Sequence, residues 1–252
     1  MGTPDTRVLT KVPEVTFFFW AIKVLAPTAG ETAADHLHFT LGLHPVVATF
    51  LFAAAALAAL AVHVGRHRYL AVAYWSAMVL VGTVGTLVAD LLTESAGVPL
   101  WIVSMGSAAL LLVVVTVSLR PITAPAREGW YWLAVLVAFV LGGAAGDWAV
   151  ELTGWRPGAA VLLPAALIVV VALARRFGGG AIASFWLVFV LTGTLGAALG
   201  DFLARPLAEG GLGLGYEVTS LLFAAAVAGG GVHLATGHSD RTERRFGLEP
   251  GA

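Results

Sequence analysis

The sequence contains no cysteine, which excludes disulfides, thiolate metal sites and cysteine nucleophiles. Charged residues are scarce: they make up 12% of the 252 residues, against about 25% in soluble domains. The net charge is −1, so no electrostatic bias points to nucleic acid. Apolar residues account for 59% of the chain, and the mean hydropathy is +0.90. This composition indicates an integral membrane protein with no room for a second, soluble domain.

Eight long apolar runs are separated by charged residues and helix breakers. A membrane-spanning helix needs roughly 20 mostly apolar residues, and runs without strict alternation favour helices over barrel strands. The expected helices cover residues 13–37, 45–64, 70–92, 99–119, 130–152, 157–174, 181–204 and 216–236. The sequence therefore predicts an all-α integral membrane protein. We expect residues 1–236 to form its single transmembrane domain and residues 237–252 to form a mobile cytoplasmic tail.

Basic residues are distributed unevenly between the two sets of loops. One side of the membrane has only Arg156 and Arg205. The other side collects eleven basic residues: Arg7, Lys11, Arg66, Arg68, Arg120, Arg127, Arg175, Arg176, Arg241, Arg244 and Arg245. Because basic loops stay in the cytoplasm, we expect both termini to be cytoplasmic.

Four tryptophans recur at intervals of 55, 57 and 54 residues, and each is followed by a glycine after ten residues and an aspartate after fifteen. These sets are Trp20, Gly30 and Asp35; Trp75, Gly85 and Asp90; Trp132, Gly142 and Asp147; and Trp186, Gly196 and Asp201. They define repeats of about 11–66, 67–122, 123–177 and 178–236. Each repeat holds two helices, so all four repeats share one orientation. We expect a pseudo-fourfold arrangement about the membrane normal.

Packing roles suit the repeated glycines and tryptophans. Glycine lets transmembrane helices approach one another closely. Tryptophan is enriched at membrane interfaces, so the four tryptophans are expected to form an aromatic belt at the cytoplasmic side.

The repeat pattern resembles a family of bacterial multi-pass membrane proteins built from four tandem two-helix repeats of unknown function, each with a characteristic tryptophan. The similarity is greatest in Lys11-Val12-Pro13-Glu14-Val15-Thr16 and Gly30-Glu31-Thr32-Ala33-Ala34-Asp35. The resemblance extends from about residue 11 to residue 236. It implies the repeat fold and the bacterial inner membrane, and it implies no activity.

The repeated aspartates occupy equivalent places near the outer ends of four helices. A carboxylate inside a membrane costs roughly 2.5–3.5 kcal/mol, so it usually faces a bundle interior or a wet cavity. Three of the aspartates have a second acid four residues away: Glu31, Glu94 and Glu151. In the fourth repeat, Arg205 stands four residues after Asp201. These residues predict a quasi-symmetric, electronegative ion site with one built-in counter-charge.

Clustered carboxylates must bind a cation, bind protons or pair with bases, because they cannot all stay ionised close together. Oxygen ligands suit hard divalent cations, and the nearby His36, His38 and His44 would extend the range to zinc and nickel. The alternative is that the aspartates cap helix ends or hydrogen-bond between repeats.

Lys23 lies in the middle of the first expected helix, where the other repeats have Met78, Val135 and Phe189. A buried lysine readily changes protonation state and can replace a cation as a carboxylate partner. It is therefore a candidate coupling residue. The alternative is a fixed ion pair with a carboxylate on a neighbouring helix.

Together these residues predict a membrane transporter or channel-like exchanger for a small inorganic cation, with protons as a candidate second ion, rather than an enzyme. A divalent metal would then be its substrate rather than a cofactor. Two alternatives remain open: a haem-binding redox protein that uses His63 and His233, and a non-transporting scaffold with structural acids.

Overall fold

A computed structural model describes residues 15–66, 70–120 and 123–246, and these residues form helices and turns without any strand. The longer elements are α1 (Phe17–Asp35), α2 (Pro45–Gly65), α3 (Ala71–Asp90), α4 (Leu100–Ser118), α5 (Ala124–Thr153), α7 (Leu162–Arg176), α8 (Ala181–Ala204) and α9 (Gly215–Phe246). The short elements are η2 (His36–Thr40), η3 (Leu91–Ser95), α6 (Pro157–Ala160) and η4 (Leu207–Glu209). The helical class predicted from sequence is confirmed.

Six helical segments in the described part of the chain are long and apolar enough to cross a membrane. They are Pro45–Gly65, Ala71–Ser95, Leu100–Ser118, Ala126–Thr153, Pro157–Arg176 and Ala181–Ala204. In α1 the apolar stretch, Phe17–Gly30, is shorter. The last helix, α9, continues to Phe246 and so includes residues 237–246 of the segment predicted as a tail. The structure therefore supports a multi-pass membrane protein with at least six candidate spans.

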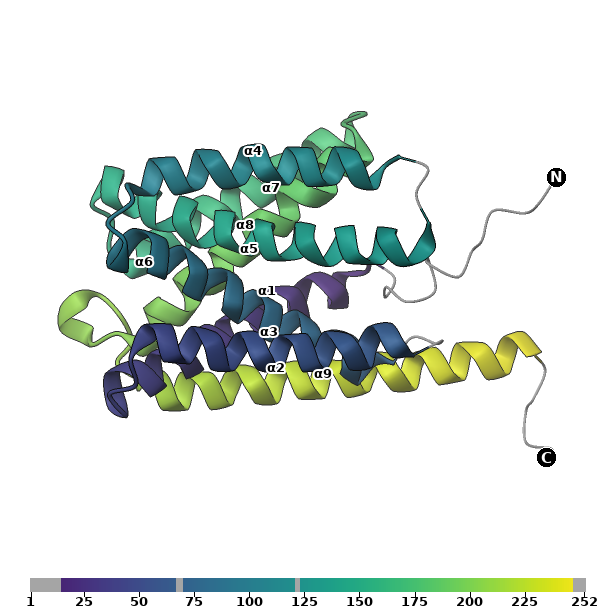
Figure 1. Cartoon of the computed structure of the whole chain (residues 1–252), viewed down its shortest axis with the longest axis horizontal. Coiled ribbons are helices and arrows are strands. Elements are labelled where there is room, and N and C mark those ends of the chain that lie inside the picture. The colour runs from purple at the N-terminus through teal and green to yellow at the C-terminus, as the bar shows by residue number, and fades with distance from the viewer. Residues whose placement is uncertain (1–14, 67–69, 121–122, 247–252) are drawn as a thin grey trace.

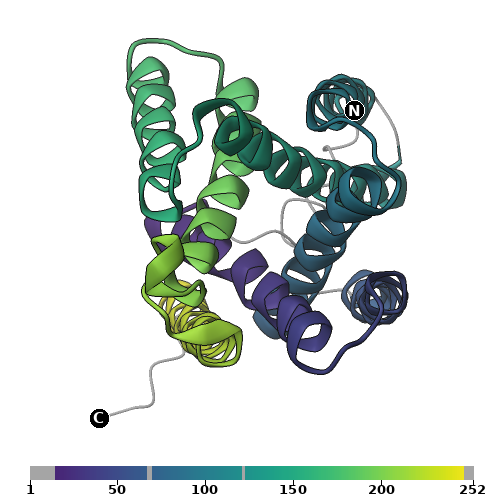
Figure 2. The ribbon, with the colours of Figure 1, turned by 90° about the vertical axis from the view of Figure 1, so that its left-hand side faces the viewer.

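Four helices form the inner part of the bundle. α1 packs against α3, α3 against α5, α5 against α8, and α8 back against α1. Seen from one end, these four helices surround the centre, and the other long helices lie at the periphery (Figure 2). The side view shows that most of the long helices run roughly along one common direction (Figure 1).

Each peripheral helix covers the inner helix that follows it along the chain. α2 packs against α3, α4 against α5, and α7 against α8. The last helix, α9, packs against α1. Each peripheral helix therefore covers the next repeat, and the last repeat covers the first.

Two inner helices change their hydrogen-bond pattern directly after the repeated aspartate. α1 continues into η2 and α3 into η3, and both are π-helical turns. A π turn has i→i+5 bonds, and in α3 this change falls between Asp90, the last α-helical residue, and Glu94. By contrast, α5 stays α-helical through Asp147 and Glu151 and ends at Gly154, whose φ of 62° permits the left-handed turn.

Candidate functional site

A cavity of about 160 Å³ lies between α5, α8 and the α6–α7 segment. Its lining includes Asp147 from α5 and Asp201 from α8. Arg205, the residue that ends α8, lines it as well, together with Thr194 and Trp155. Two of the four repeated aspartates are thus brought to one cavity by adjacent inner helices.

The charges in this cavity are only partly balanced. Arg205 Nη2 lies 2.9 Å from Asp201 Oδ2, and both side chains are partly exposed. Burial lowers the pKa of Arg205, but the hydrogen bond and charge of Asp201 outweigh this, so the pKa is raised above its ordinary value. Asp147 is exposed at the cavity and lies within electrostatic range of Asp201, Glu94 and Arg205. Since Arg205 offsets Asp201, Asp147 leaves a net negative charge.

The remaining predicted acids lie outside the cavity lining. Asp90 is the last residue of α3 and is partly buried, whereas Glu94 and Glu151 are exposed. Glu31 and Asp35 belong to α1, but their side chains lie outside the described set. Convergence of all the repeated acids stays a prediction.

The three histidines of the first hairpin make local contacts. His38 Nδ1 lies 2.9 Å from the Leu43 carbonyl oxygen, and His44 Nδ1 accepts the Val46 N–H at 3.3 Å at the start of α2. His36 lies in η2. Among the side chains that the structure describes, no group of three or more histidines and acids is arranged to hold a metal ion. The predicted metal binding therefore has no support from the described side chains.

Lys23 is fully buried among the inner helices. Its Nζ donates to the Phe189 carbonyl oxygen at 2.7 Å and lies 4.1 Å and 3.9 Å from the ring centroids of Phe139 and Phe189. Ring faces attract an ammonium electrostatically. Within the described part of the molecule, the contacts of this ammonium are thus a carbonyl and two rings, where a carboxylate was expected.

The positions equivalent to Lys23 form a closed layer. Met78, Val135 and Phe189 are all fully buried, as Lys23 is. The inner helices are therefore packed tightly at this level.

The four repeat tryptophans make ring contacts between repeats rather than a belt that faces only lipid. Trp75 and Trp132 are buried in the bundle. Each tryptophan contacts the aromatic residue that precedes the tryptophan of another repeat: Phe19–Trp75 at 5.6 Å, Tyr74–Trp132 at 5.6 Å, Tyr131–Trp186 at 6.3 Å and Phe185–Trp20 at 5.6 Å between ring centroids. These contacts link all four inner helices in a closed circuit.

Repeat glycines lie at close approaches between inner helices. A Cβ at Gly30 would overlap the Thr83 side chain, and one at Gly142 would lie 3.1 Å from the Val190 carbonyl oxygen. Thr194 Oγ1 donates across the same α5–α8 contact to the Gly142 carbonyl oxygen at 2.7 Å. Small residues here bring the backbones together.

A second polar cluster lies at the other end of the bundle, and most of it was missed from sequence. His63 on α2 pairs with Glu128 on α5, and Tyr74 pairs with Tyr131. The sequence marks His63 only as a candidate haem ligand. Its Nε2 faces Glu128, so iron ligation through this atom would break the pair. The side chain of His233 lies outside the described set. Comparing the residue before each repeat tryptophan would have revealed the tyrosines.

The profile of one protein family, Repeat of Unknown Function (DUF347), matches residues 18–69, 73–121 and 184–234. The chain belongs to this family. The three matched DUF347 segments correspond to the first, second and fourth repeats; residues 123–177 are unmatched, although Trp132, Gly142 and Asp147 keep the register. The predicted resemblance is thereby confirmed. Searches of curated proteins and of solved structures gave no match.

Proposed function

We propose that the chain crosses the bacterial inner membrane eight times, as four parallel two-helix repeats with pseudo-fourfold symmetry about the membrane normal. The closed packing order of α1, α3, α5 and α8, and the cover that α9 provides for α1, support this arrangement. α1 and α9 would supply the two spans beyond the six long apolar segments. The basic loops would face the cytoplasm together with both termini.

We propose further that the protein transports or exchanges a small cation. The observation that carries this proposal is the convergence of Asp147 and Asp201 on one cavity, with Arg205 offsetting only one of the two charges. A cavity with a net negative charge attracts a cation and lowers the cost of removing its water. The closed layer around Lys23 in the middle of the bundle, and the aromatic contacts beyond it, support a bundle that is closed on the side away from the cavity.

The nature of the cation follows from the donors present. A metal ion without its water needs four or more ligands at about 2.0–2.6 Å, whereas two carboxylates, one of them paired to Arg205, line the described cavity. A divalent metal would therefore enter hydrated or would use Glu31 and Asp35 as further ligands. Lys23, a fully buried residue of α1 whose ammonium contacts α8, is the proposed coupling residue.

Flux into proteoliposomes tests the proposal. Divalent metals, monovalent metals and a small organic amine are offered separately to the parent protein and to Asp147→Asn and Asp201→Asn. Each substitution keeps the shape of the side chain but removes a charge, so we expect a loss of at least about tenfold in uptake, equivalent to about 1.4 kcal/mol. Glu217→Gln, an exposed acid outside the cavity lining, is the matched control and should retain uptake.

Thermal stability measured with and without cation distinguishes a shared cation site from a set of independent structural hydrogen bonds. Groups that share one ligand are energetically coupled, whereas separate hydrogen bonds add independently. The double variant Asp147→Asn/Asp201→Asn should therefore lose little more cation-dependent stabilisation than either single variant. Strictly additive losses, no cation-dependent shift in the parent and no flux would reject transport and favour the scaffold.

A further inference from the structure

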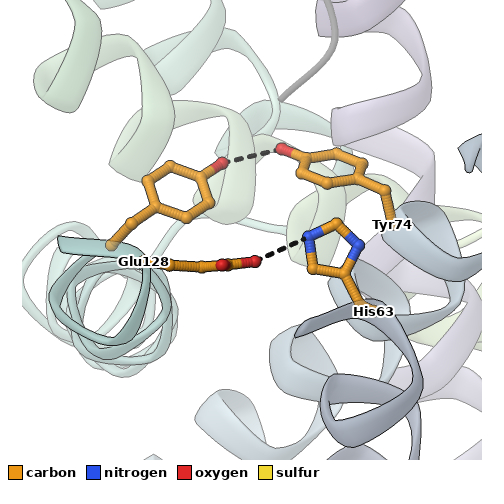
Figure 3. Close-up of polar contacts among 4 residues, drawn as sticks. His63, Tyr74 and Glu128 are labelled. Carbon is orange, nitrogen blue, oxygen red and sulfur yellow. Dashed lines mark hydrogen bonds and ion pairs between the residues drawn. The ribbon is translucent and has the colours of Figure 1, made fainter. Parts of the chain in front are cut away.

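A buried polar cluster joins α2, α3 and α5 at the end of the bundle opposite Asp147. His63 Nε2 lies 3.5 Å from Glu128 Oε1, and the hydroxyl oxygens of Tyr74 and Tyr131 are 2.7 Å apart. Figure 3 shows the two contacts side by side, both bridging toward α5. The start of α5 is thus tied to α2 by a titratable pair and to α3 by a neutral hydrogen bond.

Aromatic rings flank His63 of this pair. The His63 ring lies edge-on to Tyr74 and Trp132, with centroid distances of 5.7 Å and 5.4 Å. The exposed fractions of the two side chains are 4% for His63 and 12% for Glu128. Charges screened so little by water interact strongly. The Glu128 side chain is the more accessible member of the pair, although its Oε1, which faces His63, is buried.

The repeat architecture does not require these polar groups. The positions equivalent to Tyr74 and Tyr131 are Phe19 and Phe185, which make corresponding ring contacts without a hydroxyl. The positions equivalent to Glu128, four residues before each tryptophan, are Thr16, Ala71 and Ile182. Burying an ion pair costs desolvation energy that apolar packing avoids. A histidine–carboxylate pair at this corner, where the compared positions of the other repeats carry no charged side chain, therefore points to a role beyond packing.

We propose that the His63–Glu128 pair is a proton-binding site that exchanges with the basic-loop side of the membrane. In the loaded state, an imidazolium faces a carboxylate and the pair is neutral. On release, the imidazolium N–H bond breaks, the proton passes to water, and a neutral imidazole remains beside an uncompensated carboxylate. This inference does not depend on the proposed cation transport, because the pair lies at the other end of the bundle.

Release of the proton would weaken the His63–Glu128 contact, one of the two polar contacts that hold the start of α5. The described titratable or charged groups near the pair are Tyr74 on α3, Tyr131 on α5, and the exposed Arg66 and Arg127 next to the ends of the helices. The tyrosines stay neutral near pH 7, so the hydrogen bond between α3 and α5 persists. The contact between α2 and α5 is then the part of this corner that responds to pH.

Tryptophan fluorescence of the purified protein reports whether His63 is protonated. A protonated imidazole beside an indole quenches its emission more than a neutral one, and Trp132 contacts His63. We expect a step in emission between about pH 5 and pH 8, the range in which histidine titrates. His63→Gln should abolish the step. Glu128→Gln should move its midpoint to lower pH, because the imidazolium loses its carboxylate partner.

His44→Asn is the matched control, because this exposed histidine caps the opposite end of α2 and asparagine retains an acceptor. The step should be unchanged in this variant. His63→Phe/Glu128→Gln, which keeps an aromatic ring in the cluster, should lack the step and covers the case in which His63→Gln does not fold. A step that survives loss of His63, a midpoint unaffected by Glu128→Gln, or no step in the parent would overturn the proton site. None of these outcomes involves flux, so they are separate from failure of the transport proposal.

Discussion

At the scale of single residues, Lys23 stands out because the other repeats have an apolar side chain at its position. From the sequence alone, the cost of a charge in the membrane predicts a carboxylate partner. In the described part of the molecule, the ammonium instead contacts the Phe189 carbonyl oxygen and the rings of Phe139 and Phe189. Sequence spacing identified the anomaly, but only the packing of α1 against α8 determined its neighbours.

Lys23→Met tests how this lysine is held. Methionine has a similar length and occupies the equivalent position in the second repeat, and Thr192 Oγ1 also donates to the Phe189 carbonyl oxygen at 2.9 Å. We therefore expect the free energy of unfolding to change by no more than about 1 kcal/mol. Reversible unfolding in mixed detergent provides the measurement. Lys23→Ala, which leaves a void, should cost about 2–4 kcal/mol.

A loss above about 3 kcal/mol in Lys23→Met would contradict this prediction, because breaking a buried ion pair has a cost of that size. It would favour a fixed pair with a carboxylate outside the described side chains.

At the scale of elements, contacts between inner helices depend on small residues at equivalent places. Gly30 on α1 faces Thr83 on α3, and Gly142 on α5 faces Val190 and Thr194 on α8. The sequence pattern located these glycines, and the packing role proposed for them matches their close contacts. It did not identify the facing residues, because those depend on which helices are neighbours.

Gly30→Ala should weaken the α1–α3 contact. An added Cβ would lie 2.8 Å from the Cβ of Thr83 and closer to its hydroxyl oxygen, so one backbone must move. We expect a loss of about 1–3 kcal/mol in unfolding free energy, partly restored in Gly30→Ala/Thr83→Ala. Gly106→Ala is the control: a Cβ there meets nothing within 4 Å. It should be neutral or stabilising by up to about 1 kcal/mol. Equal losses in both single variants would contradict the close-approach argument.

At the scale of the whole molecule, the packing order is closed: each peripheral helix covers the next inner helix, and α9 covers α1. Removal of one terminal repeat would therefore expose two inner helices rather than one end of a row. The same order brings aspartates of the last two repeats to one cavity and leaves the His63–Glu128 pair at a single corner.

Cysteine accessibility tests the orientation of the whole bundle, and the absence of native cysteine gives a clean background. Four exposed positions suit the test: Gly65 and Gly180 near the basic loops, and Ser95 and Ala208 at the other end. In intact cells, an impermeant thiol reagent should label Ser95→Cys and Ala208→Cys and spare Gly65→Cys and Gly180→Cys. Permeabilised cells should show labelling at all four. The reverse pattern would place the aspartates on the cytoplasmic side.

The sequence by itself determined the helical membrane class, the repeat and the family. These properties depend on composition and on spacing along the chain, since an apolar run long enough to span a bilayer leaves few choices other than a helix. The register of Trp, Gly and Asp likewise needs no tertiary information.

Only the tertiary structure decided which helices are neighbours and therefore which charges meet. Asp147 shares a cavity with Asp201, and His63 meets Glu128, 65 residues further along the chain. The spacing predicted one shared site for all four repeated aspartates, but it did not say which two would meet, and it gave no sign of the His63–Glu128 pair. Both outcomes depend on the packing of helices that turns and loops separate in sequence. In a bundle of similar apolar helices, neighbours are chosen by the fit of small and large side chains. That fit depends on both helix surfaces, so the sequence of one helix does not determine which helix it packs against.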